Sequence, residues 1–306
     1  MMAESNTSTP PRTHPEPEGP VTLYYEFRVP NPEHAKVLDT IDALIALMQG
    51  KTGYLSLSLK QMTGESTMVK NYPEHLKGVL AQGYIDNPKV PEFYSLLLRF
   101  ADLEALESSD VQSWFEENIA PSLFAYSGTT KPPTKTGIAL DVFKGVFITV
   151  AAGDRSAIYT TPDEIRQFLA HQSDEVGNAS VTVENHVMIN DRQVAPFNET
   201  VKALLTIAQD TCRPDVNDTD YDAAYPHGRE GSKDNHHYRK AVTTEILQNA
   251  YPDGDLRAYL MHGVWESVYD HENSHIDPRF QQASGPVGAY VVSGPVEPFY
   301  RTIKQG

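Results

Sequence analysis

The sequence has few cysteines and few positive charges, and both shortages narrow the classes of protein to consider. Cys212 is the single cysteine among 306 residues, which excludes an intrachain disulfide framework and any structural zinc module built on two or more thiolates. The 25 lysines and arginines face 41 aspartates and glutamates, for a net charge of −16. Because a basic surface is needed to bind nucleic-acid phosphates, we expect no nucleic-acid partner.

Long apolar runs and glycine-rich phosphate loops are also missing from the sequence. No run approaches the roughly 20 apolar residues that span a bilayer, so we expect no membrane partner. No glycine-rich loop follows a predicted strand, which leaves nucleotide binding unsupported. Residues 1–20 are rich in Pro, Ser, Thr and Glu and lack a basic and an apolar signal region. They predict a disordered tail on a cytoplasmic protein.

The chain divides into two similar halves joined by a linker. Residues 21–152 predict strands and helices in the order β-α-β-β-α-β of the ferredoxin-like unit. Residues 153–178 predict a linker with a short helix capped by Thr161, and the order returns over residues 179–306. The predicted strands cover residues 21–29, 54–60, 91–99, 142–150, 181–189, 218–225, 256–265 and 288–292, and the predicted helices cover 33–48, 103–120, 161–171, 197–210 and 266–277.

A repeated pattern near the end of each half supports this division. Residues 78–86, followed by a strand that ends at Phe100, correspond to residues 245–253, followed by a strand that ends at Trp265. We interpret each as a helix followed by a strand. Two such units can pair their sheets into a closed barrel with an internal cavity. We therefore predict an α+β fold of tandem ferredoxin-like repeats forming a dimeric α+β barrel, with two unrelated α+β domains as the alternative.

The residues that suggest chemistry lie near the C-terminus, in the segment His271-Glu-Asn-Ser-His275. The i, i+4 spacing puts both imidazoles on one face of the predicted helix, as a bidentate metal site requires. Glu297 follows the last predicted strand, between two prolines that restrict its backbone. Two histidines and a carboxylate leave metal positions open, as in non-haem Fe(II) oxygenases. The corresponding first-half positions hold Leu106 and Asp110, so the predicted metal site belongs to the second half alone.

The same five residues also match H-E-x-x-H, the signature of zinc peptidases, with Glu272 as the general base. Glu297 could then be the third zinc ligand, so the ligand set does not choose between zinc and iron. In such peptidases the downstream glutamate usually lies on a helix. Pro295 and Pro298 disfavour a helix around Glu297, and a zinc hydrolase stays an alternative.

Two segments together resemble the iron-binding region of the sulfur oxygenase reductases: Trp265-Glu-Ser-Val-Tyr-Asp-His271-Glu-Asn-Ser-His275 and Gly294-Pro-Val-Glu297-Pro-Phe-Tyr300. The resemblance implies that His271, His275 and Glu297 coordinate a mononuclear non-haem iron inside a dimeric α+β barrel. It also implies O2 as co-substrate, sulfur or a sulfur compound as substrate, and assembly into a homo-oligomer.

The sequence departs from that family in two respects. Members of the family carry the iron in their first half, whereas this chain carries the motif in its second half. The family also uses a persulfidated cysteine in the first helix of the iron-bearing half, and the candidate here, Cys212, follows the predicted helix at 197–210. Further residues that we expect to line the pocket or orient the metal ligands are His262, Trp265, Tyr290 and Tyr300.

The sequence thus predicts a non-haem iron oxidoreductase that uses O2 and a small-molecule substrate. Three alternatives stay open beside it. They are a zinc hydrolase, a metal-free dimeric α+β-barrel monooxygenase, and a non-catalytic barrel protein that binds a ligand. Metal content and O2 consumption distinguish among them.

Overall fold

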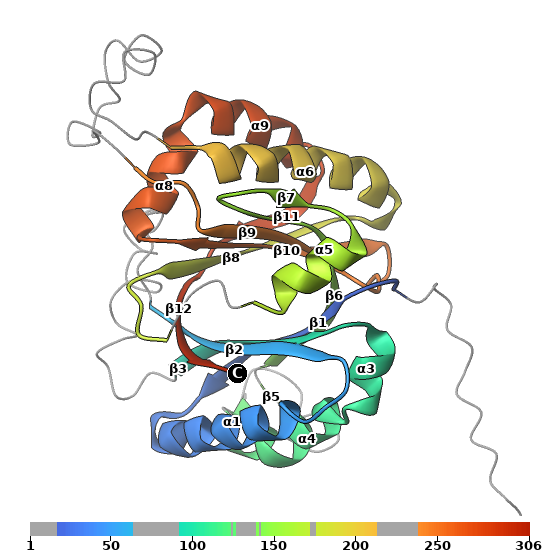
Figure 1. Ribbon diagram of the computed structural model, residues 1–306, viewed down its shortest axis with the longest axis vertical. Coiled ribbons are helices and arrows are strands. Elements are labelled where there is room, and N and C mark those ends of the chain that lie inside the picture. The colour runs from blue at the N-terminus through green and yellow to red at the C-terminus, as the bar shows by residue number, and fades with distance from the viewer. Residues whose placement is uncertain are drawn as a thin grey trace, which may run out of the picture.

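The described part of the chain is a closed antiparallel sheet with helices packed on two opposite sides (Figure 1). The computed structural model describes residues 17–63, 92–123, 125–126, 139–140, 142–171, 176–212 and 238–306. The predicted elements at 78–86 and 218–225 lie outside these residues.

Eight strands form the barrel, four from each half of the chain. They are β1 (Val21–Val29), β2 (Tyr54–Met62), β3 (Glu92–Phe100), β6 (Val142–Asp154), β8 (Val181–Asn190), β9 (Thr243–Asn249), β10 (Leu256–Trp265) and β12 (Phe299–Gln305). Their order is β1-β3-β2-β12-β8-β10-β9-β6, and β6 pairs back to β1 to close the barrel. The halves meet where β12 pairs with β2 and where β9 pairs with β6.

Shorter strands and the helices complete the described structure. The remaining strands are β4 (Ala125–Tyr126), β5 (Ala139–Leu140), β7 (Ile158–Tyr159) and β11 (Val291–Val296). The helices are α1 (His34–Met48), α3 (Leu103–Ser108), α4 (Val111–Asn118), α5 (Pro162–Leu169), α6 (Val194–Asp210), α8 (Val268–Ile276) and α9 (Pro278–Gly288), with 3-10 turns at Asn31–Glu33, Ala120–Ser122 and Asp191–Gln193. In Figure 1, α1, α3 and α4 cover one side of the barrel and α6, α8 and α9 the other.

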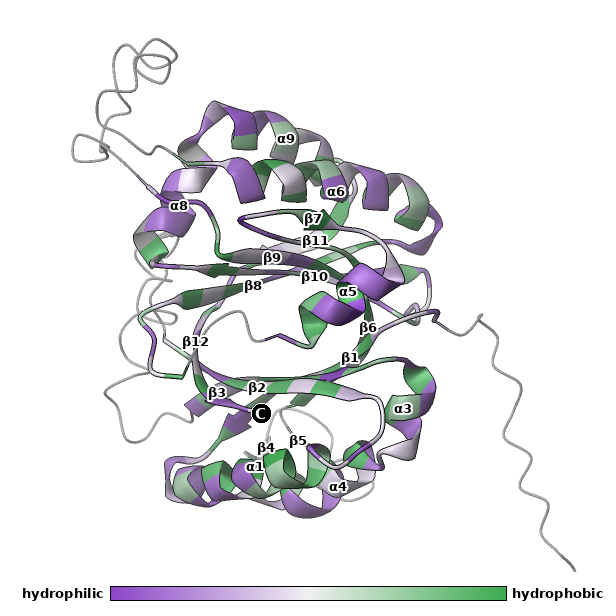
Figure 2. Cartoon of the chain, in the orientation of Figure 1, coloured by the Kyte–Doolittle hydropathy of each residue, from purple (hydrophilic) through white to green (hydrophobic). Residues whose placement is uncertain are grey.

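The period of two along each strand decides which side chains face the helices and which face the barrel interior. On β1, Val21, Leu23 and Tyr25 pack into the hydrophobic core under the first-half helices. Tyr24 points the opposite way and packs with Leu247 and other interior residues. Both faces of β1 are therefore buried, and polar colours in Figure 2 mark the outer faces of the covering helices.

Most of the sequence-based element predictions agree with the structure. The α+β class is confirmed, and the predicted strand at 256–265 and the predicted helix at 33–48 fall on β10 and α1. The helix cap predicted at Thr161 is present at the start of α5, where Glu164 completes a capping box. The single helix predicted at 103–120 is instead two helices, because Asp110 adopts a left-handed backbone with φ of 56° between them.

Two predictions near the C-terminus were wrong. The helix expected at 245–253 is largely strand β9, in which Glu245 and Leu247 face the barrel while Ile246 packs toward the helices. Side chains that alternate between two faces are typical of a strand. The alignment with residues 78–86, interpreted as a helix, led to the wrong prediction. The strand expected at 288–292 begins later, because α9 continues to Gly288 and β11 starts at Val291.

The barrel interior holds a polar network that joins the two halves. Arg99 of β3 makes a bidentate ion pair with Glu245 of β9, with distances of 2.7 and 2.6 Å. Tyr24 of β1 donates to Glu184 of β8 at 2.5 Å. Lys60 of β2 donates to threonine hydroxyls of β8 and β12. These contacts bring together residues that are far apart in the sequence, so they hold the two halves in one barrel.

Within the described residues, no helix combines the length and apolar character needed to cross a membrane.

Candidate functional site

A cavity of about 350 Å³ lies between the second-half wall of the barrel and the helices α6, α8 and α9. Most of its lining is apolar, with side chains from α6, from α9 and from the outward faces of β9 and β10. These include Val201, Leu204, Leu205, Ile246, Met261 and Phe280. Eight polar residues join them, namely Asn185, Thr244, Glu245, His262, His271, His275, Ser284 and Glu297. An apolar cavity with a few convergent polar groups is the usual form of a small-molecule site.

Helix α8 places the two histidines of the H-x3-H segment in the cavity. The helix begins directly after β10, where the Ser267 side chain accepts a hydrogen bond from the Asp270 backbone N–H. The i, i+4 spacing then brings the rings of His271 and His275 together, with centroids 4.3 Å apart. Trp265 contacts His271 edge-on at 5.4 Å, and Phe280 stacks on His275 at 4.5 Å. Aromatic packing therefore fixes both imidazoles.

Burial keeps both imidazoles neutral near pH 7. Desolvation and then the neighbouring His275 hold the pKa of His271 well below its usual range. Desolvation lowers the pKa of His275 to about 4. A neutral imidazole can accept a proton, accept a hydrogen bond or ligate a metal ion. Both rings therefore have the protonation state that these roles require.

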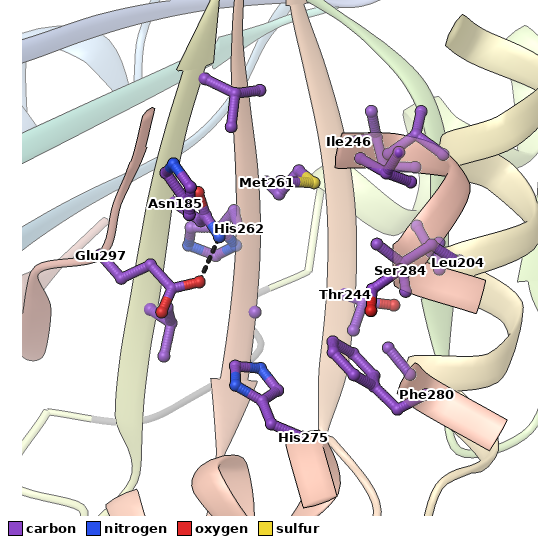
Figure 3. A pocket seen from close by; sticks show the side chains of 18 of the residues that line it. Asn185, Leu204, Thr244, Ile246, Met261, His262, His275, Phe280, Ser284 and Glu297 are labelled. Atoms are coloured by element: carbon purple, nitrogen blue, oxygen red, sulfur yellow. Dashed lines mark hydrogen bonds between the residues drawn. The ribbon is translucent and has the colours of Figure 1, made fainter. Parts of the chain in front are cut away.

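Glu297 enters the same cavity from the segment that follows β11. Gly294, within β11, lets this strand approach β8 closely, because an added Cβ would collide with the carbonyl oxygen of His186. The Asn185 side-chain nitrogen donates a hydrogen bond to Glu297 Oε1, as the dashed line in Figure 3 marks. Burial, and then the charge of Glu272, raises the pKa of Glu297 to about 7. A carboxyl group with this pKa can act as a base near neutral pH.

Several buried polar atoms of the cavity residues make no hydrogen bond within the described structure. They are Asn185 Oδ1, His262 Nε2, His271 Nδ1 and Glu297 Oε2. Each such atom costs free energy when it stays unsatisfied. Among the described residues, however, no three His, Cys, Asp or Glu side chains are placed together so that they could hold a metal ion. The rings of His271 and His275 are adjacent, and Glu297 is turned toward Asn185 (Figure 3).

The other residues singled out from the sequence are divided between the cavity and the rest of the fold. Trp265 lines the cavity. His262 also reaches the barrel interior, where its Nδ1 lies 3.9 Å from Glu245 Oε2. The Tyr300 hydroxyl donates to Glu26 at 3.0 Å, which places it in the interior network. Tyr290 packs edge-on against Phe197 in the core under α6.

Cys212 follows the C-terminal end of α6 and lies outside the set of described residues that line the cavity. Its backbone oxygen accepts a hydrogen bond from Arg279 at 3.4 Å. Burial raises the pKa of its thiol, which therefore stays protonated near neutral pH. The structure thus brings His271, His275, Glu297 and Trp265 to one cavity and leaves Cys212 apart from them.

Asn185 is a cavity residue that the sequence analysis missed. It lies on β8 between Val183 and Val187, which share its face of the strand and also line the cavity. A polar residue among apolar ones on the same face of a strand is the signal that could have identified it. Its partner Glu297 is 112 residues away, so the pairing itself has no local signature.

Comparison with protein families finds two matches that together cover most of the chain. Residues 150–303 match the family described as CT0912-like, C-terminal domain. Residues 20–105 match the ABM-like domain. No curated protein matches the sequence. The family matches agree with an α+β barrel, and the resemblance to sulfur oxygenase reductases stays a prediction.

Two solved structures share the fold over nearly their whole length. One is a candidate monooxygenase from Fusobacterium nucleatum, with a TM-score of 0.54, 9% sequence identity and 94% of each chain covered. The other is a candidate monooxygenase from Lactobacillus acidophilus, with a TM-score of 0.51 and 8% identity, covering 94% of this chain and 96% of that one. At this identity the likeness shows the fold alone.

Proposed function

Because the chain belongs to the CT0912-like family, whose C-terminal domain covers residues 150–303 behind an ABM-like domain, we propose that it is an O2-dependent oxygenase. The names of the two structural neighbours, both candidate monooxygenases, support this class of reaction. The observation that carries the proposal is the apolar cavity lined by Glu297 and two neutral histidines. Its substrate is a small, largely apolar molecule.

In the metal-free form of this reaction the substrate supplies its own electrons. Glu297, with a pKa of about 7, takes a proton from an acidic CH2 group, and the carbanion passes electrons to O2. The CH2 group becomes a carbonyl, one oxygen atom of O2 enters the product, and the other leaves as water. The neutral imidazoles of His271 and His275 accept and return protons during these steps. Apolar walls exclude bulk water from the carbanion.

A mononuclear iron bound by His271, His275 and Glu297 is the second candidate mechanism. The chemistry of the donor set supports it, because two neutral imidazoles and a carboxylate with an unpartnered buried oxygen line one cavity. A bound ferrous ion would supply O2 binding and activation. Glu297 would have to turn from Asn185 toward the histidines, since Asn185 holds it on the other side of the cavity.

Metal content and O2 uptake, measured on the same preparation, test the proposal. The probes are 5-hydroxy-2-indanone, a largely apolar ketone with acidic CH2 groups and a hydroxyl group that donates a hydrogen bond, and elemental sulfur. Uptake with the ketone that survives removal of metal and fails in Glu297→Gln supports the metal-free reaction. Iron near one per chain, lost in His271→Ala together with O2 uptake, supports the iron mechanism. An absence of O2 uptake with either probe, in both metal-free and iron-loaded protein, contradicts the oxygenase proposal.

The remaining expectations from the sequence are separate proposals on the same site. Sulfur as the substrate rests on the family resemblance, and it requires sulfur-dependent O2 uptake that Cys212→Ala abolishes. A zinc hydrolase requires zinc and a peptidase activity that Glu272→Gln removes.

We also infer that the barrel is a tandem ferredoxin-like repeat, because the strand orders β2-β3-β1-β6 and β9-β10-β8-β12 are equivalent. Homo-oligomer formation stays a prediction.

A further inference from the structure

The cavity has two chemically different sides. Leu204, Ile246 and Phe280 form an apolar side, and Asn185 and Glu297 lie opposite them (Figure 3). A ligand that fills the cavity must therefore have an apolar body and a polar head. The arrangement of the polar atoms shows what kind of head fits.

The polar side presents hydrogen-bond acceptors. The Asn185 nitrogen already donates to Glu297 Oε1. This contact fixes the amide orientation, because the amide oxygen has no hydrogen to donate to an ionised carboxylate. Besides the ring nitrogens His262 Nε2 and His271 Nδ1, the buried cavity atoms left without a partner are Asn185 Oδ1 and Glu297 Oε2. A ligand head satisfies them when it donates hydrogen bonds, and a head that only accepts leaves them unsatisfied.

The charges around the cavity point in the same direction. Among the described residues that line it, the ionisable ones are acidic or histidine, and none is lysine or arginine. Arg99 compensates the charge of Glu245 in the barrel interior. Glu297, by contrast, has the charge of Glu272 nearby. A negatively charged ligand would be buried beside a carboxyl group without a lining cation, which is strongly unfavourable.

We propose that the cavity binds an amphipathic molecule whose head is a hydrogen-bond donor without negative charge, an alcohol or an amine, held by Asn185 Oδ1 and Glu297 Oε2. The inference rests on the proposed function only in taking this cavity as the substrate site. It excludes carboxylates and other anions as substrates. It also identifies Asn185 as the residue that distinguishes a donor head from an acceptor head.

Four ligands that share one rigid apolar body test the proposal. They are 1-adamantanol, 1-adamantylamine, 1-methoxyadamantane and 1-adamantanecarboxylate. Trp265 lines the cavity and is one of two tryptophans in the chain, so Trp114→Phe leaves its fluorescence as a specific reporter of binding. We expect the alcohol, the amine or both to bind at least about tenfold more tightly than the ether and the carboxylate. The alcohol and the amine together show whether the site prefers a neutral or a cationic donor.

Variants then show which residue causes the preference for a hydrogen-bond donor. Asn185→Leu keeps a similar volume and removes the acceptor, so the advantage of the alcohol over the ether should fall by about tenfold. Asn118→Leu, on the exposed face of α4 in the first half, makes the same change far from the cavity and should leave the advantage intact. Should Asn185→Leu fail to fold, the wild-type ligand series alone still decides.

The outcomes separate this inference from the oxygenase proposal. Carboxylate or ether binding as tight as that of the alcohol and the amine would overturn the ligand class, whatever the catalytic activity. The expected binding order, together with no O2 uptake from the ketone or sulfur probe of the activity experiment, would leave the ligand class standing and refute the oxygenase. O2 uptake that requires an anionic substrate would support the oxygenase and overturn the ligand class.

Discussion

Glu184 lies in the middle of the barrel, where Tyr24 and Ser95 donate hydrogen bonds to its two oxygens at 2.5 and 2.8 Å. The hydrogen bonds favour the ionised carboxylate, but burial, together with the charge of Glu26, outweighs them. The result is a pKa raised from 4.5 to about 7. A carboxyl group whose two oxygens both accept hydrogen bonds can therefore still have a pKa near neutral pH.

The raised pKa predicts a loss of stability with increasing pH. Below pH 4.5 Glu184 is protonated in both the folded and the unfolded state. As the pH rises from 4.5 to about 7 the unfolded chain loses the proton first, so the free energy of unfolding falls. The fall due to this residue is at most about 3 kcal/mol. Above the folded pKa, no further change from Glu184 is expected.

Urea denaturation at pH 5 and pH 8 measures the effect, with Glu184→Gln as the comparison. Gln cannot ionise and can still accept a hydrogen bond from Tyr24 or Ser95. Against its burial, Glu26 and then Glu184 raise the pKa of His186, so His186 also loses stabilising energy as the pH rises, in both proteins but less in the variant that lacks the Glu184 charge. The prediction therefore concerns the difference between them. An equal pH dependence in wild type and variant would contradict it.

Among the elements, α8 has the largest effect on the site, because its nine residues carry both histidines. Its first turn depends on Ser267, whose side chain accepts from the Asp270 backbone and donates to the Asp270 carboxylate at 2.6 Å. Asp270 in turn accepts from the Arg239 backbone at 2.8 Å. The start of α8 is thus tied to the segment that precedes β9.

Ser267→Ala should destabilise the protein by about 1 kcal/mol through the loss of this cap. It should also weaken binding of 1-adamantanol or 1-adamantylamine, because His271 and His275 lose their fixed placement. Thr161→Ala is the matched control, since Thr161 caps α5 with the same chemistry and does not line the cavity. We expect similar loss of stability in urea but unchanged binding. Equal effects of both variants on binding would show that α8 has no special role.

The elements show how far sequence reasoning reaches. The H-x3-H spacing and the helix that carries it are local features, so the sequence alone was enough to pair His271 with His275. Glu297 is far from them in the sequence; its carboxylate between two prolines suggested it as the third ligand, and the family resemblance implied the same set. Asn185 could not be found in that way, because its contact with Glu297 depends on the packing of the β11 segment against β8. The strand β9 was missed because its apolar residues suit a helix as well.

At the scale of the whole molecule, strand pairing closes the barrel, and its interior brings together side chains that no sequence pattern had linked. Tandem units were predicted from the order of elements, and the structure confirms an α+β fold whose halves contribute four strands each. The interior network was not predicted, because the polar residues of a predicted strand are expected to face solvent. Arg99 and Glu245 are 9% and 1% exposed in their side chains. Closure of the barrel removes both from solvent.

The Arg99–Glu245 pair predicts strong coupling between the two halves. Arg99→Leu leaves a buried carboxylate without its cation and should cost about 3–5 kcal/mol of unfolding free energy, and Glu245→Leu should cost a similar amount. The double variant should be much less destabilised than the sum, because two apolar residues leave no uncompensated charge. The exposed pair of Lys304 and Asp42, at 2.6 Å, also joins the halves.

Lys304→Leu serves as the control for this cycle and should change stability by no more than about 1 kcal/mol, because solvent screens the pair. Urea denaturation of the four proteins in the cycle, followed by Trp114 in the first half and Trp265 in the second, gives the coupling energy. Both reporters should show a single transition at the same urea concentration, since the barrel needs strands from both halves to close. Additive losses in the double variant, or separate transitions of the two tryptophans, would mean that the halves are stabilised independently and that the interior network does not join them.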